Sequence, residues 1–514
     1  MWRALTRWRA IAACAACAVC AAVAIPAVAA AGQESVIMRV APRAITRAIA
    51  PGFLGLALEY SGIREWVGSG TAPNPVLVQL IRNLDPAGRP VIRVGGLSTD
   101  HSWWPVPGMR EPLGITYNLT PAWAHSLQSL ARTLDARLVL GVNLEADSPR
   151  LAQTEASAFL TWIGRRYITA LDIGNEPPLY QGMPWYRTKG DQLIPWYDDI
   201  GTPVFARGPS WDPAAFVADY ARILNVLPRV PIAGPDTQRA SWFAAYERFL
   251  SAHSRVRMLT SHGYGLNNCV TNPASAASPS IPHLLGDYAL HDLLNTLTPY
   301  VSDAHANGAT FRIDEMGSVT CNGRVGVSNT MASALWAAAA LFSVAQDRVD
   351  GVNLHTFPGL SNGLFDFTDA AGGWTADVHP IYYGALLFAH AAPAGSRLLH
   401  VSLSGSPTLH GWATTGPGAV RHVVLLNDST TDSAAVMVRA PHGVLGTRPA
   451  QLARLSGPSV SATSGLSLGG RSFGAVTTSG LLRPPLSDPV RVRGGAFHVS
   501  VPAASAAMLT FTVR

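Results

Sequence analysis

The chain has 514 residues, more than one hydrophobic core usually supports, so two domains are expected. Hydrophobic residues make up 48% and charged residues 14%, a balance typical of a globular protein and not of a disordered one. The formal net charge of +6 is mild and spread along the sequence, which argues against a nucleic-acid partner.

The first 29 residues have the pattern of a secretory signal peptide. Three arginines precede an apolar stretch over residues 11–25, and the small-x-small sequence at 27–29 resembles a cleavage site. The apolar stretch is about 15 residues long, short of the roughly 20 needed to span a bilayer. We therefore expect export, to the periplasm or outside the cell, without stable membrane insertion. Lipid anchoring at Cys20 is the alternative.

Removal of this segment would lower the net charge to +3 and leave two cysteines, Cys269 and Cys321. Two cysteines in an exported protein predict one disulfide. The alternative is a pair of buried free thiols.

After the leader, short β-rich runs alternate with helical patterns eight times. The runs are rich in Val, Ile and Leu without clean alternation, as expected for strands buried on both faces. Eight strand–helix units predict a (β/α)8 TIM barrel over residues 51–394. A doubly wound sheet, the alternative, would need a phosphate-type glycine loop after the first strand, which is missing here. The expected strands are 53–60, 90–96, 138–145, 168–175, 231–235, 256–262, 310–315 and 351–356.

The pattern changes near residue 395. From there on, short Val/Leu/Thr runs are separated by Gly, Ser, Pro and Asn clusters, and helical periodicity is lost. This predicts an all-β C-terminal domain, a sandwich, over 395–514. Residues 30–50 also look like β-structure, and we expect them to join the C-terminal sheet.

Two glutamates stand at the ends of predicted strands. Glu176 follows the fourth strand and Glu315 ends the seventh, and charged groups are costly to bury without a partner. In a barrel, functional residues project from the C-terminal ends of the strands, and strands three apart face each other. Two carboxyl groups about 5–5.5 Å apart, one protonated and one ionised, are what a retaining glycosidase requires. The pair predicts a retaining glycoside hydrolase; two ordinary loop glutamates are the alternative.

Several segments resemble a known family. Gly174-Asn175-Glu176-Pro177 is similar to the acid/base motif of the clan of (β/α)8 retaining glycoside hydrolases. Residues 53–59, 92–96 and 315–328 resemble glycoside hydrolase family 79, the β-glucuronidase and heparanase family. The resemblance implies a barrel with an appended β-sandwich, Glu176 as acid/base, Glu315 as nucleophile, a carbohydrate substrate and no cofactor. Sequence spacing also indicates no metal, because the histidines lack ligand spacing.

Neighbouring polar residues then become candidate substrate contacts. Asn175 would bind the sugar 2-OH, an interaction that strengthens in the transition state. Tyr264, after the sixth strand, either orients Glu315 through its hydroxyl or is a buried structural tyrosine. His355 ends the eighth strand and is either a substrate contact or a core histidine.

Two acidic residues near the first and second strand ends are also candidates. Glu59 and Asp100 either bind sugar hydroxyls or form ion pairs with Arg64 or Arg93. Residues 178–211 form a long aromatic-rich insertion after Glu176, which either walls the binding site or packs on itself.

The loop after Glu315 bears on the sugar. In family 79 this loop helps bind the glucuronate carboxylate through backbone amides and a nearby tyrosine. Here Asn322 and Gly323 can offer amides and Arg324 a charge, but the loop has no tyrosine. Glucuronate is the favoured sugar, with glucoside, xyloside or galactoside as alternatives. A non-catalytic carbohydrate-binding protein on the same scaffold is the rival from another class, and the presence of both glutamates argues against it.

Overall fold

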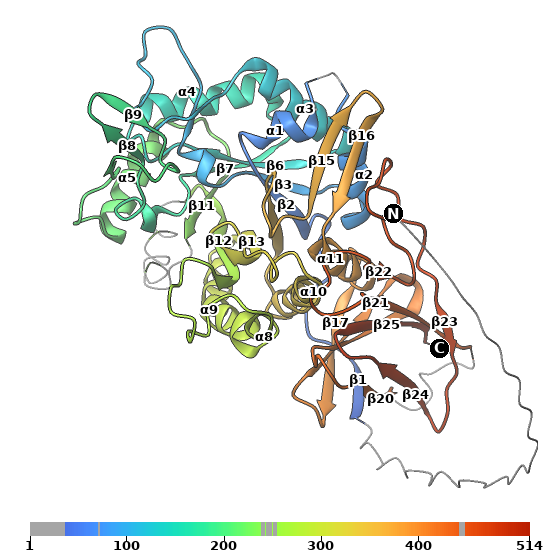
Figure 1. The fold of residues 1–514 in the computed structure, drawn as a ribbon. Coiled ribbons are helices and arrows are strands. Elements are labelled where there is room, and N and C mark those ends of the chain that lie inside the picture. Colours follow the sequence, from blue (N-terminus) through green and yellow to red (C-terminus); the bar gives the residue numbers. More distant parts are fainter. Residues whose placement is uncertain are drawn as a thin grey trace, which may run out of the picture. The chain divides into compact units, whose positions relative to one another are not determined.

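The computed structural model of the chain describes residues 36–69, 72–237, 254–440 and 448–513, together with 242 and 249 (Figure 1). The predicted signal peptide and Cys20 lie outside these residues. Within the described part, none of the helices has both the length and the apolar character that a membrane span requires.

Eight parallel strands close into a barrel, with the last strand paired to the first. The predicted (β/α)8 barrel is thereby confirmed, and the doubly wound alternative is wrong. The strands, in chain order, are β2 (Leu54–Glu59), β3 (Val91–Gly95), β6 (Arg137–Val142), β7 (Ile168–Ile173), β11 (Ile232–Thr237), β12 (Val256–Asn267), β13 (Thr310–Thr320) and β14 (Gly351–Thr356).

Helices connect the strands, and several begin with a polar N-cap followed by proline at the first helical position. Asp212 is one such cap, and its carboxylate accepts a hydrogen bond from the backbone N–H of Ala215 at 2.8 Å. Within the described residues, the α-helices are α1 (Gly62–Val67), α2 (Pro75–Leu84), α3 (Pro121–Leu134), α4 (Pro149–Phe159), α5 (Pro213–Val226), α8 (Ile281–Leu284), α9 (Leu293–Ala306), α10 (Met331–Gln346) and α11 (Pro380–Ala391).

Two neighbouring barrel strands extend far beyond their predicted ends. β12 and β13 continue five residues beyond the expected ends, to Asn267 and Thr320, and remain paired with each other. Glu315 therefore lies inside β13 and not at its end. The expected ends were wrong because both extensions carry glycine and polar residues, which ordinarily mark loops but here are mostly buried.

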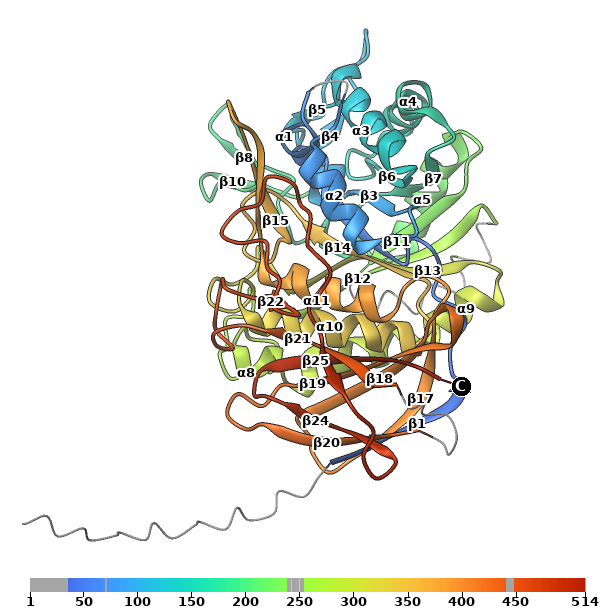
Figure 2. The ribbon, with the colours of Figure 1, turned by 90° about the vertical axis from the view of Figure 1, so that its right-hand side faces the viewer.

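The C-terminal domain is a mixed β-sheet, and the first strand of the described residues, β1, belongs to it. β1 (Val36–Ala44) pairs antiparallel with β17 and parallel with β20. In Figure 2, β20 and β24 form a layer beside β19 and β25. The strands are β17 (Arg397–Ser404), β18 (Leu409–Thr415), β19 (Val420–Asn427), β20 (Ala434–Arg439), β21 (Ala450–Ser456), β22 (Ser467–Leu468), β23 (Asp488–Val490), β24 (Ala496–Val501) and β25 (Ser505–Thr512).

A continuous hydrophobic core joins this sheet to the barrel. Helices α10 and α11 are buried on almost all sides, and they lie between the barrel strands and the C-terminal sheet (Figure 2). Phe342 of α10 stacks on Trp412 of β18 with ring centroids 5.1 Å apart. A helix that is apolar all round is expected where both of its faces are covered by protein.

The aromatic-rich insertion after β7 folds into a small antiparallel sheet. Its strands are β8 (Tyr186–Lys189), β9 (Gln192–Ile194) and β10 (Thr202–Val204), in the order β10-β8-β9. A further hairpin, β15 (Phe365–Ala370) and β16 (Gly373–Val378), follows β14, and a short parallel pair, β4 (Ser102–Trp103) and β5 (Tyr117–Asn118), follows β3.

Candidate active site

Glu176 is held in an unusual backbone conformation just beyond the end of β7. Its φ of 46° lies in the left-handed region, which costs free energy for a residue with a side chain. The backbone N–H of Glu176 donates to the Asp236 carbonyl at 3.0 Å, and a turn of 3-10 helix over Pro177–Leu179 follows. Because this conformation is fixed from both sides, the carboxylate of Glu176 is directed by the fold and not by a flexible loop.

Glu315 lies on β13 opposite His262 of β12 and is almost fully buried. Its Oε1 accepts a hydrogen bond from the Tyr264 hydroxyl at 2.6 Å, and its Oε2 accepts one from Arg93 at 2.7 Å. Burial by itself would raise the pKa of the Glu315 carboxyl. His262, His355 and Arg93 outweigh that effect and, with the Tyr264 hydrogen bond, lower the pKa to about 2.

The two glutamates lie close together across the barrel mouth. One carboxylate oxygen of Glu176, one of Glu315 and one ring nitrogen of His262 all lie within 4.8 Å of one another. His262 Nδ1 is 2.9 Å from Glu176 Oε1. Carboxylate and imidazole donors at this spacing are also compatible with a metal ion, as are those of Asp236, His262 and Asp314. An oxygen–oxygen distance of at most 4.8 Å is compatible with the spacing of about 5–5.5 Å between the carboxyl groups of retaining glycosidases.

Arg93 is the cation at the centre of this site and is 1% exposed. Its guanidinium reaches Glu315, Asp236 at 2.6 Å, and the side-chain oxygen of Asn175 at 2.8 Å. It lies 3.4 Å from Asp314. The alternative for Glu59 and Asp100, an ion pair with Arg93, is therefore wrong, because the donors of Arg93 turn toward Glu315, Asp236 and Asn175.

The side-chain oxygen of Asn175 accepts the hydrogen bond from Arg93, which leaves the amide nitrogen Nδ2 as its remaining side-chain donor. The backbone N–H of Asn175 donates to Asp100 Oδ2 at 2.9 Å. Among the described hydrogen bonds, none uses the Asn175 Nδ2 group. Its geometry is thus compatible with donation to a ligand in the mouth.

A second chain of contacts approaches Glu315 from β14 and β2. The oxygen of Tyr264 lies 3.1 Å from His355 Nδ1, and His355 Nε2 lies 3.3 Å from Glu59 Oε1. The other oxygen of Glu59 accepts hydrogen bonds from the backbone N–H and the hydroxyl of Ser98. Burial would lower the pKa of His355, but Glu315 and Glu59 raise it above its usual value. Glu59 therefore faces His355 at the mouth and forms no ion pair with Arg64 or Arg93 in the described contacts.

Asp100 has a structural position that differs from the predicted one. It is 2% exposed, and one carboxylate oxygen accepts from the backbone N–H groups of Leu144 and Glu145. The other accepts from the Asn175 N–H and the Tyr180 hydroxyl. With four donors on two oxygens, Asp100 ties loops together and has no capacity left for a sugar hydroxyl. The predicted sugar contact of Asp100 is corrected accordingly.

Most aromatic rings of the insertion pack within it or onto adjacent loops. Tyr180 stacks on Trp211, Trp185 donates to the Asp100 carbonyl at 3.3 Å, and Trp196 stacks on His101. Tyr197 and Phe205 are more exposed, at 61% and 43%. The alternative interpretation, that the insertion packs on itself, therefore holds for its buried rings.

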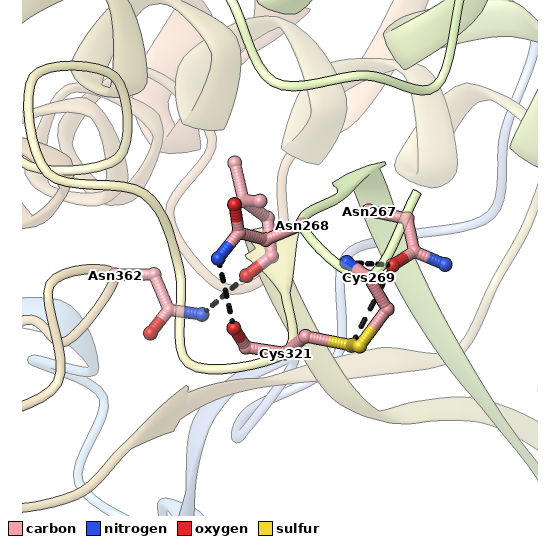
Figure 3. Close-up of a disulfide and its surroundings, with 6 residues drawn as sticks. Asn267, Asn268, Cys269, Cys321 and Asn362 are labelled. Carbon is pink, nitrogen blue, oxygen red and sulfur yellow. Dashed lines mark hydrogen bonds between the residues drawn. A yellow bond between two sulfur atoms is a disulfide. The ribbon is translucent and has the colours of Figure 1, made fainter. Parts of the chain in front are cut away.

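Cys269 and Cys321 form the predicted disulfide, so the free-thiol alternative is wrong. Figure 3 shows the bridge at the ends of β12 and β13, where Asn268 donates to the Cys321 carbonyl at 3.4 Å. Cys321, Asn322 and Gly323 all have positive φ, so the loop after β13 turns sharply. Ser361 fixes this turn by donating to the Asn322 carbonyl at 3.0 Å.

Sequence reasoning missed several buried residues of the site. His262, Asp236, Asp314 and Asp172 are each 1% exposed or less. The signal that could have found them is a charged residue inside a run predicted to be a buried strand, because such residues need partners.

Comparisons with known proteins agree with this architecture. Residues 411–508 match the model of the glycosyl hydrolase family 79 C-terminal beta domain. A β-glucuronidase from Neurospora crassa is 23% identical over 455 residues, which cover 77% of this chain and 76% of that protein. The resemblance to family 79 seen in the sequence is thereby confirmed.

Solved structures share the fold at low sequence identity. A 4-O-α-L-rhamnosyl-β-D-glucuronidase from Fusarium oxysporum 12S has a TM-score of 0.67 and 18% identity, covering 92% of this chain and 100% of its own. A family 51 arabinofuranosidase from Xanthomonas axonopodis pv. citri has a TM-score of 0.63 and 16% identity, covering 93% and 100%. The chain thus shares its fold with these two enzymes.

Proposed function

We propose that this protein, a glycoside hydrolase of the family 79 type, is a retaining β-glucuronidase. The observation that carries the proposal is the pair formed by Glu176 and Glu315, whose carboxylate oxygens approach within 4.8 Å at one end of a (β/α)8 barrel. A short separation favours direct attack by one carboxylate, because no room is left for a water molecule behind the sugar. The signal-peptide pattern supports an exported enzyme acting on extracellular or periplasmic carbohydrate.

Glu315 is the proposed nucleophile. A group with a pKa of about 2 is ionised at every pH at which such an enzyme works, and it can attack the anomeric carbon. Arg93 and Tyr264 hold its two oxygens, so the carboxylate is oriented before the sugar arrives. Attack forms a covalent bond between Glu315 and the anomeric carbon as the glycosidic C–O bond breaks.

Glu176 is the proposed acid/base. It gives its proton to the departing glycosidic oxygen and later takes a proton from the water that hydrolyses the glycosyl–enzyme bond. The second displacement releases Glu315 as a carboxylate and returns the sugar with its original configuration. His262, 2.9 Å from Glu176, fixes the orientation of the carboxyl group in both steps.

The loop after β13 supports glucuronate as the sugar. Three successive residues with positive φ, 321–323, turn the backbone, and the described hydrogen bonds use neither the Asn322 nor the Gly323 amide. Free backbone amides in such a turn make a concave site for an anion. The Neurospora relative is named a β-glucuronidase, which agrees with this assignment.

A panel of chromogenic β-glycosides tests the proposal. We expect hydrolysis of the glucuronide in preference to the glucoside, xyloside and galactoside, and loss of that activity in Glu315→Ala. Proton NMR of the first product should show the β-anomer. Equal inactivity of wild type and Glu315→Ala on all four sugars would reject the enzyme, and first release of the α-anomer would reject the mechanism.

A further inference from the structure

The residue before Glu176 is held by the start of the insertion over residues 178–211. The backbone N–H of Asn175 lies 2.9 Å from Asp100 Oδ2 and 3.2 Å from the hydroxyl oxygen of Tyr180. The Tyr180 hydroxyl in turn donates to the same Asp100 oxygen at 2.7 Å. These three hydrogen bonds form a closed set, and they fix the peptide N–H that lies one residue before Glu176.

The residue after Glu176 is held by the far end of the same insertion. The indole Nε1 of Trp211 donates to the Pro177 carbonyl at 2.8 Å. Trp211 also stacks on Tyr180, with ring centroids 6.0 Å apart and ring planes 20° from parallel. A buried indole N–H needs an acceptor, and here the acceptor is the peptide carbonyl next to Glu176. The two ends of the insertion thus meet on the two sides of one residue.

Arg207 connects both aromatic rings to the barrel. Its guanidinium lies 5.7 Å from the centre of the Tyr180 ring and 5.0 Å from that of Trp211, within the range of cation–π contacts. The same group donates to the carbonyls of Leu144 and Glu145, just beyond β6, at 3.1 and 2.9 Å. The Arg207 side chain is 11% exposed, so these contacts are largely shielded from solvent. The two rings are therefore fixed relative to the neighbouring barrel strand.

Glu176 needs such support because its backbone is strained. A residue with a side chain keeps a φ of 46° only where its surroundings impose that conformation. The N–H groups of Asn175 and Glu176 and the carbonyl of Pro177 each have a hydrogen-bond partner, so three successive residues are held. A relaxed φ would turn the Glu176 carboxyl away from its place 2.9 Å from His262. A displacement of about 1 Å at a reacting group can cost about 10²-fold in rate.

We infer that Asp100, Tyr180, Arg207 and Trp211, which we call the Glu176 clamp, are positioning residues for the acid/base. They act on the backbone around Glu176 and not on the sugar, because the two rings that could stack on a sugar, Tyr180 and Trp211, are only 2% and 6% exposed. The buried part of the insertion is thus a support for Glu176. The catalytic role of Glu176 in this inference rests on the proposed function, whereas the contacts of the clamp do not.

Matched substitutions test the clamp. Tyr180→Phe keeps the ring and removes the hydroxyl that contacts Asp100 and Asn175. Tyr382→Phe, the control, removes an equally buried hydroxyl that donates to the Leu80 carbonyl at 2.8 Å, where α11 packs on α2. Each variant loses a buried hydrogen bond, so both should have a lower melting temperature. Trp211→Phe, which keeps a flat ring but loses the bond to the Pro177 carbonyl, provides a second clamp variant.

The leaving group distinguishes positioning from stability. A displaced acid matters most where the departing oxygen needs a proton, so each clamp variant should lose more activity on an alkyl glucuronide than on an activated aryl glucuronide. We expect the ratio of the two kcat/KM values to change by about fivefold or more, part of the 10²- to 10⁴-fold that a general acid contributes. Tyr382→Phe should keep the ratio of wild type. An unchanged ratio in both clamp variants, or an equal change in Tyr382→Phe, would overturn the inference.

Hydrogen exchange measured by mass spectrometry gives a readout that needs no substrate. Amide exchange in peptides that span residues 174–180 should be faster in Tyr180→Phe and Trp211→Phe than in wild type, and unchanged in Tyr382→Phe. Unchanged exchange in both clamp variants would also overturn the inference. If wild type cleaves no glycoside, yet exchange over 174–180 accelerates in the clamp variants alone, the clamp stands and the proposed function fails.

Discussion

His262 and Glu176 form a direct contact, with Nδ1 of the imidazole 2.9 Å from Oε1 of the carboxylate. The same nitrogen is 3.9 Å from Glu315, so one ring lies against both proposed catalytic groups. Burial would lower the pKa of His262, but Glu315, Asp236 and Glu176 raise it well above its usual value. The ring is therefore placed to stabilise the charge of Glu315 and to orient Glu176.

Replacing His262 by asparagine should impair both functions. His262 is the largest of the charges that lower the pKa of Glu315, so its loss should move the acidic limb of the kcat/KM profile to higher pH. We expect kcat/KM at neutral pH to fall about a hundredfold, the scale of a disturbed acid/base group. The control is His305→Asn, which removes a partly buried histidine paired with Asp350 outside the site. An unmoved acidic limb in His262→Asn would contradict the role of the ring.

The leaving group should reveal the role of Glu176. In Glu176→Gln the glycosidic oxygen receives no proton, so an aglycone that departs easily as an anion should be cleaved far better than a poor one. We expect kcat/KM for an alkyl glucuronide to fall by about 10⁴ and for an activated aryl glucuronide by much less. Glu315→Gln, the matched control, should lose activity on both substrates alike. Equal losses in Glu176→Gln would contradict acid catalysis by this residue.

Tyr264→Phe should weaken Glu315 without unfolding the barrel. The lost hydroxyl donates to the carboxylate at 2.6 Å, and a hydrogen bond to a charged group contributes about 1.5–3 kcal/mol. We expect kcat/KM to fall about 10- to 100-fold and its acidic limb to move to higher pH. Tyr180→Phe also removes a hydroxyl from a buried carboxylate, that of Asp100, and should lower the melting temperature while leaving the limb in place. A limb that moves in both variants, or in neither, would reject the assignment of Tyr264.

The barrel could be predicted because its signal is repeated. Eight apolar runs separated by helical patterns leave few alternatives, and runs such as 168–175 and 351–356 match the observed strands within two residues. The pair of Glu176 and Glu315 could be predicted for a related reason, since each is a carboxylate that follows or interrupts a buried strand. Both predictions use local pattern together with the geometry of a closed barrel.

The contacts that these residues make could not be predicted from the sequence pattern. The sequence placed Asp100 at the barrel mouth. In the structure its carboxylate instead accepts hydrogen bonds from Leu144, Asn175 and Tyr180, which are distant in sequence. From the sequence alone, several carboxylates were equally plausible partners of Arg93. Only the order of the strands in the barrel brings Asp236 and Glu315 to it. The local sequence gives the chemical type of a side chain but not the residues that it contacts.

Gly323→Ala should test the loop that we assign to the glucuronate carboxylate. Gly323 has a φ of +74°, and an added Cβ would come within 2.4 Å of the Ser361 hydroxyl oxygen, so the turn must shift. We expect KM for the glucuronide to rise about tenfold or more while any cleavage of the matching glucoside changes little. Gly326→Ala is the control, because its φ of +80° is equally strained but its Cβ meets no atom within 4 Å. A similar rise in KM on both sugars would show that the loop does not recognise the charge.

Acid stability should depend on Glu315 in a defined pH window. Its pKa falls from the ordinary value of 4.5 to about 2 in the folded protein, so its ionised form stabilises the fold above pH 4.5. That contribution, about 3 kcal/mol at neutral pH, is lost as the pH falls from about 4.5 to about 2, because the folded state must then take up the proton. Glu315→Gln lacks this titration. The difference in melting temperature between wild type and Glu315→Gln should therefore shrink through that window, whereas Glu111→Gln, at an exposed carboxylate, should match wild type throughout. A difference that stays constant between pH 6 and pH 2 would mean that Glu315 does not gain its ionisation from the fold.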